Sequence, residues 1–133
     1  MINQKAKFEC WVDGKEPVIV DYIPPLGDGE GYTSLELLLL SLASCFGSTV
    51  KFLINRQLKT NVDGLRVKVS GIRRQEHPTS FESIKLELIV NSSVIKPDVL
   101  EKMIQAAKEK FCPVWAMVKN NAEMSTEYTI MPA

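Results

Sequence analysis

A chain of 133 residues with 45% hydrophobic and 24% charged residues has the composition of a soluble globular protein, and we expect one domain over residues 1–133. Sixteen basic side chains balance sixteen acidic ones, which argues against nucleic acid or an acidic membrane surface as a partner. No basic segment followed by an apolar one opens the chain, so we expect a cytoplasmic protein with reduced cysteines.

The first third of the chain predicts a hairpin followed by a long helix. Residues 8–12 and 18–22 have the composition of strands, and Asp13-Gly14 between them is typical of a tight turn. A loop rich in proline and glycine follows. Thr33 and Glu36 then have the spacing of a capping box, which predicts a helix that begins there and ends near Gln57.

This helix is apolar enough to require a membrane check. Residues 35–54 have about the length that crosses a bilayer, but Glu36 and Lys51 lie within them. A helix that is apolar nearly all round lies either in lipid or in a protein core. We interpret this one as the buried central helix of a soluble protein, and expect no membrane partner.

The rest of the chain predicts strands and helices in alternation. Residues 65–70 and 84–90 alternate with the period of half-buried strands. Pro97 begins a helix that reaches Phe111, Pro113 begins another that ends near Asn121, and residues 127–131 form a last strand. The order ββ-α-ββ-α-α-β favours the α+β class, with an antiparallel sheet wrapped around the long central helix.

Two cysteines stand in settings that suit reactive thiols. Cys45 lies in the middle of the apolar helix, and Cys112 directly precedes Pro113, at the N-cap of the next helix. Free N–H groups at that cap favour a thiolate on Cys112. If the fold brings the two together, the chain holds a dithiol that can reduce a substrate and close to a disulfide.

Three segments resemble the OsmC/Ohr family of thiol peroxidases. They are the helix from Ser34 through Cys45, the strand-turn-strand from Arg73 through Ile84, and Cys112-Pro113-Val114. The resemblance implies an OsmC-like intertwined homodimer, with Cys45 attacking an organic hydroperoxide, Cys112 resolving the sulfenic acid as a disulfide, and a dithiol reductant restoring the site. It implies a role in oxidative stress defence.

The chain departs from the family pattern at two positions. The well-studied branches carry a carboxylate ten residues before the reactive cysteine, where this chain has Leu35; its acid, Glu36, stands nine before. They also hold the thiolate with an N-terminal arginine, whereas the first arginine here is Arg56. Candidate substitutes are Lys15, Arg56 and Arg73, the last two from a partner chain.

Each candidate residue also has a purely structural interpretation. Cys45 could be a small buried hydrophobe, Cys112 a capping residue, and Glu36 the acid of the capping box rather than a catalytic group. Cys10 is expected in the strand core. A single histidine and the absence of a C-x-x-C pair argue against a metal, and no cofactor is expected. The alternative function is a noncatalytic OsmC-like module that binds a small apolar ligand or a partner.

Overall fold

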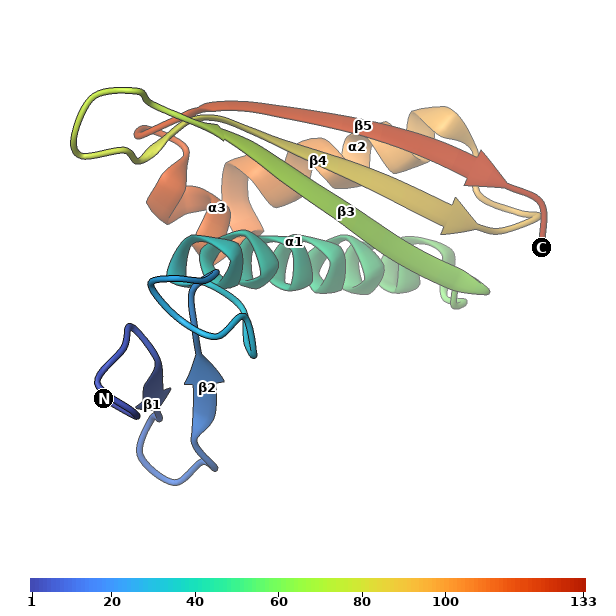
Figure 1. The fold of residues 1–133 in the computed structure, drawn as a ribbon. Coiled ribbons are helices and arrows are strands. Elements are labelled where there is room, and N and C mark those ends of the chain that lie inside the picture. Colours follow the sequence, from blue (N-terminus) through green and yellow to red (C-terminus); the bar gives the residue numbers. More distant parts are fainter. The chain divides into compact units, whose positions relative to one another are not determined.

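The computed structural model describes all 133 residues and divides them into two compact units, Met1–Leu38 and Leu39–Ala133. Figure 1 shows the elements in chain order: β1 (Phe8–Cys10), β2 (Val18–Val20), α1 (Ser34–Leu58), β3 (Gly64–Arg73), β4 (Phe81–Asn91), α2 (Pro97–Ala106), the π-helical turn η1 (Ala107–Phe111), α3 (Pro113–Val118) and β5 (Glu123–Met131). The predicted α+β class and the predicted order of strands and helices are confirmed. A single domain over residues 1–133 stays a prediction.

The first unit is a short antiparallel ribbon followed by a loop. β1 pairs with β2 in a register that places Phe8 opposite Val20 and Cys10 opposite Val18. Gly14 has a φ of +80° in the connecting turn, a conformation that glycine adopts without strain. The expectation that Cys10 is a core residue is wrong, because its side chain is exposed. A ribbon of two three-residue strands has too few neighbours to cover both of its faces.

The capping box at the start of α1 is confirmed. The Glu36 backbone N–H donates to Thr33 Oγ1 at 3.2 Å, and the Thr33 backbone N–H donates to Glu36 Oε1 at 2.9 Å. Two backbone donors that the first helical turn leaves unpaired are thereby satisfied. The local sequence therefore determines where this helix begins.

The second unit contains a three-stranded sheet in the order β3-β4-β5. β3 pairs antiparallel with β4, whereas β5 runs parallel to β4, with Ile84 opposite Met124 and Val90 opposite Ile130. The prediction of an antiparallel sheet is therefore wrong for the last strand. The two helical segments between β4 and β5 carry the chain back to the starting end of β4, which is the crossover that a parallel pair requires.

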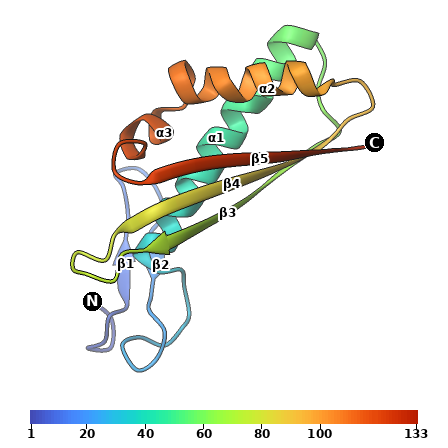
Figure 2. The same cartoon turned by 90° about the horizontal axis from the view of Figure 1, so that it is seen from above.

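Helices cover one face of this sheet (Figures 1 and 2), and the core lies between them. α1 contributes a buried stripe at intervals of four residues, and β4 contributes every second side chain. These buried residues are Leu42, Phe46, Val50 and Ile54 from α1, and Ile84, Leu86, Leu88 and Val90 from β4. The opposite face is charged, with ion pairs between Lys68 and Glu87 and between Lys85 and Glu127. The sheet thus has one apolar and one polar face, as its alternating sequence predicts.

α1 is long and apolar enough to cross a membrane by length and composition alone. Within the second unit, however, it packs closely on the sheet. A Cβ atom added at Gly47 would lie only 2.9 Å from Val67 Cγ2 of β3. The buried stripe and this close approach support the interpretation of α1 as a core helix.

The segment before Cys112 departs from regular α-helix. The predicted helix from Pro97 to Phe111 is α-helical to Ala106 and then widens into the π-helical turn η1. Its last hydrogen bond runs from the Cys112 backbone N–H to the Ala107 carbonyl at 3.0 Å, and Pro113 begins α3. π-Helical turns are rare and often occur at functional sites.

Candidate functional site

The structure brings Cys45 and Cys112 together, although 67 residues separate them in sequence. Cys112 Sγ donates a hydrogen bond to Cys45 Sγ, and the two sulfur atoms lie 3.5 Å apart. The predicted proximity is confirmed. Both thiols are free, and a disulfide needs a sulfur separation of about 2.05 Å, so a movement of about 1.5 Å would close the bond.

Burial distinguishes the two thiols. Cys112 is 2% exposed, whereas Cys45 is only half-buried. Cys112 is the N-cap of α3, and its Sγ accepts a hydrogen bond from the Trp115 backbone N–H at 3.5 Å. The pKa of Cys112 is raised from 9.0 to about 11, mainly by burial. The hydrogen bond from the Trp115 N–H favours the thiolate and lowers this pKa, whereas the neighbouring Cys45 raises it.

The expectation that the N-cap favours a thiolate on Cys112 is therefore wrong, because the pKa of this thiol is raised. The loss of water around a buried sulfur outweighs the hydrogen bonds that the first turn of a six-residue helix supplies. Cys112 remains a neutral S–H near neutral pH, which suits a hydrogen-bond donor. Cys45 is the thiol with access to solvent.

Aromatic rings form one wall of the site. The ring of Phe46, next to Cys45 in α1, lies 5.1 Å from that of Trp115 between centroids, with an interplanar angle of 41°. Both side chains are buried. Phe46 follows Cys45 in α1 and Trp115 bonds Cys112 through its backbone, so these rings give the thiol pair an apolar neighbourhood.

Lys108 is a functional candidate that the sequence did not reveal. Its Nζ lies 5.5 Å from the centroid of the Trp115 ring, within the range of a cation–π contact. Burial lowers the pKa of this half-buried lysine. In the sequence, Lys108 is marked only by its position four residues before Cys112. Lys110 lies still closer to that cysteine along the chain, so nothing in the sequence distinguishes Lys108.

The three basic residues proposed as partners of the thiolate make contacts elsewhere within this chain. Arg73 donates to the carbonyl and the hydroxyl of Thr79 across its hairpin. Arg56 borders a groove of about 290 Å³ with Leu53, Gln57, Met103 and Phe111. Lys15 is exposed in the turn after β1, where its backbone N–H bonds the Val12 carbonyl. A contribution from a partner chain stays a prediction.

The carboxylate of Glu36 is engaged in the capping box described above, and the side chain is exposed. This is the structural role that the sequence offered for it. Its catalytic role stays a prediction.

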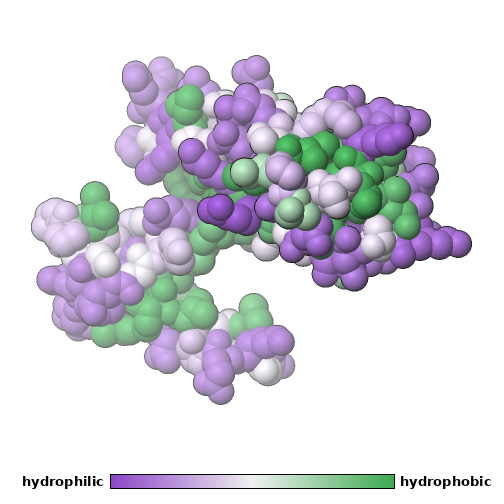
Figure 3. Space-filling view, turned by 90° about the vertical axis from the view of Figure 1, so that its right-hand side faces the viewer, coloured by the Kyte–Doolittle hydropathy of each residue, from purple (hydrophilic) through white to green (hydrophobic).

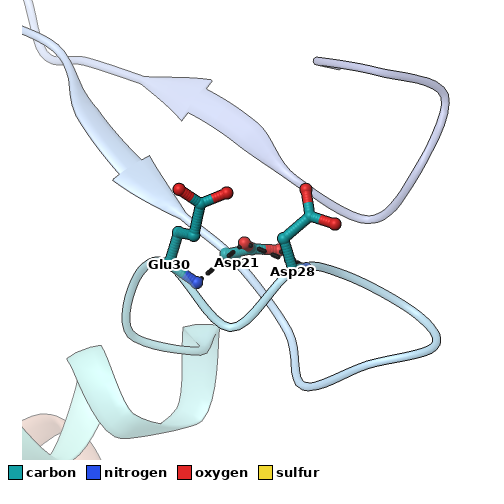
Figure 4. A group of neighbouring side chains, drawn as sticks. All are labelled: Asp21, Asp28 and Glu30. Atoms are coloured by element: carbon teal, nitrogen blue, oxygen red, sulfur yellow. Dashed lines mark hydrogen bonds between the residues drawn. The ribbon is translucent and has the colours of Figure 1, made fainter.

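Three carboxylates of the first unit, Asp21, Asp28 and Glu30, have oxygen atoms within 4.8 Å of one another (Figure 4). Burial alone would raise the pKa of Asp21, but hydrogen bonds from the backbone N–H groups of Glu30, Tyr22 and Asp28 lower it below its ordinary value. Lys5 and Lys7 form ion pairs with the other two carboxylates. Backbone N–H groups and lysine side chains already bond these carboxylates, so we interpret the cluster as one that holds the loop after β2 in place.

The chain is similar to known proteins in sequence and in fold. A family model described as "OsmC-like protein" matches residues 27–127. The protein YhfA of Escherichia coli strain K12 is 25% identical over 99 residues, which cover 74% of this chain and 73% of YhfA. An OsmC-like protein from Mycoplasma pneumoniae has a TM-score of 0.83 at 18% identity, over 98% of this chain and 93% of its own.

A solved structure described as an organic hydroperoxide resistance protein, from Legionella pneumophila, is more distant. It has a TM-score of 0.68 at 15% identity, and the match covers 95% of this chain and 98% of that one. At this identity the likeness concerns the fold.

Proposed function

This chain belongs to the OsmC-like protein family, and from that premise we propose that it reduces organic hydroperoxides, with Cys45 as the attacking thiol and Cys112 as the resolving thiol. Family membership supports a redox function related to stress. The observation that carries the finer proposal is the 3.5 Å separation of two free thiols, one accessible and one buried.

The proposed cycle has three balanced steps. The Cys45 thiolate attacks the O–O bond of the hydroperoxide, forms an S–O bond and releases an alkoxide, which takes a proton from solvent and leaves as an alcohol. Cys112 then attacks the sulfenic acid, and an S–S bond replaces the S–O bond as water leaves. A dithiol reduces the disulfide by thiol exchange and is itself oxidised to a disulfide.

The difference in burial supports this division of roles. The attacking sulfur must meet a substrate, and Cys45 is the less buried of the two. The resolving sulfur needs only to reach its neighbour. Apolar surroundings favour an alkyl or aryl hydroperoxide over hydrogen peroxide, because the buried Phe46 and Trp115 rings present mainly hydrocarbon surface.

The test is consumption of cumene hydroperoxide in the presence of a dithiol reductant. We expect turnover by the wild type and by Cys10→Ser, which alters an exposed thiol outside this pair, and none by Cys45→Ser. Cys112→Ser should form one equivalent of sulfenic acid, trapped by dimedone, and then stop. Equal turnover by the wild type and Cys45→Ser would refute the proposal.

A homodimer is the second part of the proposal. Large apolar side chains are exposed on both units (Figure 3). They include Trp11, Ile23 and Leu26 in the first unit, and Phe52, Ile72 and Met117 in the second. Because the net charge is zero, little repulsion opposes a second copy of the chain, and obligate dimers typically bury more than about 2,000 Å². Sedimentation at micromolar concentration tests this, and a monomer would refute it.

A noncatalytic binding role has one observation in its favour. Side chains of α1 and β3, among them Leu40, Ala43 and Val67, line a mostly apolar groove of about 410 Å³. A module that binds an apolar ligand there would retain binding in a Cys45→Ser, Cys112→Ser variant. Titration with an apolar fluorescent probe separates this function from the peroxidase, which that variant lacks.

A further inference from the structure

We propose that the Cys112 thiol stabilises the Cys45 thiolate before any peroxide is present, by donating its S–H hydrogen bond to the Cys45 sulfur. Cys112 would then act twice in each cycle, first as a donor and later as the resolving thiol. The inference takes its catalytic meaning from the proposed function, but the hydrogen bond itself can be tested without a substrate.

The geometry identifies the donor. Among the hydrogen bonds of this structure, the Cys45 sulfur has one partner, the Cys112 sulfur at 3.5 Å. Cys112 is 2% exposed, so its proton has no water to bond instead. Burial also raises the pKa of the Cys112 thiol, so this sulfur keeps the proton that it donates, and the Cys45 sulfur is the acceptor.

A second hydrogen bond strengthens the donor. The Trp115 backbone N–H donates to the Cys112 sulfur at 3.5 Å, so this sulfur accepts one hydrogen bond and donates another, to Cys45. Donation to a sulfur polarises its S–H bond, and hydrogen bonds in a chain reinforce one another in a medium of low dielectric. The backbone of α3 therefore acts on Cys45 through Cys112.

Few other groups can serve the thiolate from the surrounding elements. On η1, the Nζ of Lys108 lies over the Trp115 ring. On α1 the next charged side chain is Lys51, which lies 5.9 Å from the Phe52 ring. The face of β4 toward the helices presents apolar side chains such as Leu86 and Leu88. A donor role for Cys112 thus meets, within one chain, part of the need that an arginine meets in the family pattern.

The same proton completes the resolving step. When the Cys112 sulfur attacks the Cys45 sulfenic acid, the S–O bond breaks and hydroxide leaves. Cys112 gives up its S–H proton as its sulfur attacks, and this proton joins the hydroxide to give water.

The experiment is the pH profile of iodoacetamide alkylation at Cys45, read by peptide mass mapping under a non-thiol reductant. Cys10→Ser is the background. Cys112→Ser keeps a donor but cannot form a disulfide, whereas Cys112→Ala removes both. We expect the midpoint of the profile to be nearly the same for the background and Cys112→Ser. For Cys112→Ala we expect a midpoint about one pH unit higher, a roughly tenfold smaller thiolate fraction at neutral pH.

The midpoint is the readout because a more basic thiolate is also more nucleophilic, which partly masks the change in rate. Cys112→Val is a second variant without a donor if Cys112→Ala does not fold. Lys108→Met is the matched control for charge, and we expect it to move the midpoint less than Cys112→Ala does. Equal midpoints for Cys112→Ser and Cys112→Ala, or a larger shift in Lys108→Met, would overturn the inference. If the Ser and Ala variants differ as expected but the Cys10→Ser background does not consume peroxide, the proposed function fails and the hydrogen bond stands.

Discussion

The raised pKa of Cys112 predicts that the free energy of unfolding decreases at alkaline pH, because the buried thiol must then ionise. The unfolded chain releases the thiol proton near pH 9.0, whereas the folded chain holds it to about pH 11. The contribution is therefore fully present below pH 9.0 and is lost as the pH rises toward 11.

The size of the loss follows from the difference between the two pKa values. Each unit of difference is worth about 1.36 kcal/mol, so the full loss approaches about 2.7 kcal/mol at high pH. Between pH 8 and pH 10 the ionisation of the two states predicts a loss of about 1.3 kcal/mol. With a urea m-value of about 1–3 kcal/mol/M, the midpoint of unfolding should fall by about 0.4–1.3 M.

The assay is urea unfolding at pH 8 and pH 10, at one protein concentration and with a non-thiol reductant. Lysines also titrate in this range, and the Cys45 thiol interacts with Cys112, so both proteins carry Cys45→Ser. The informative quantity is the difference in pH dependence between this Cys45→Ser protein and the same protein with Cys112→Ala. The variant has its own stability cost, but it lacks the thiol and should lose about 1.3 kcal/mol less over this interval. Identical pH dependence in the two proteins would refute the reasoning that burial keeps Cys112 protonated.

Three further predictions concern the scaffold. Gly47→Ala should not stabilise the protein. Alanine gains about 1 kcal/mol of helix propensity, but its Cβ would lie only 2.9 Å from Val67, and such overpacking costs about 1–3 kcal/mol. Thermal unfolding measures the balance, and a clear rise in Tm would contradict the close approach. Thr33→Ala should cost about 1 kcal/mol through loss of the cap, whereas Thr33→Ser should retain it, as urea unfolding of the pair would show. Asp21→Asn should loosen the loop after β2 and speed limited proteolysis there, because an amide cannot accept all the backbone N–H donors that the carboxylate accepts. In the wild type, the stability that Asp21 contributes should persist above pH 3.8 and be lost only as the pH falls through its lowered pKa; cleavage at the same rate in both proteins would exclude the anchoring role.

Local sequence determined where the helices begin, whereas most strands begin or end at other residues than predicted. The capping box at Thr33 and Glu36 begins α1 because its hydrogen bonds join residues three apart, and Pro113 begins α3 because proline suits a first helical position. The alternating pattern of β4 predicted which of its side chains face the core, since successive residues of a strand point to opposite faces. The resemblance of short motifs indicated which two cysteines belong together.

Only the tertiary structure decided what those residues experience. The parallel pairing of β5 depends on where the helices return the chain, which no pattern within the strand encodes. Cys112 has the local surroundings of an acidic thiol, yet packing buries it and reverses the direction of its pKa. Lys108 lies in the π-helical turn η1 and Trp115 in α3, so the position of Lys108 over the Trp115 ring depends on how these two elements meet. The sequence therefore specified interactions between residues a few positions apart, such as helix caps. Burial of Cys112 and its contact with Cys45, 67 residues away, could be seen only in the folded chain, because desolvation depends on every neighbour in space.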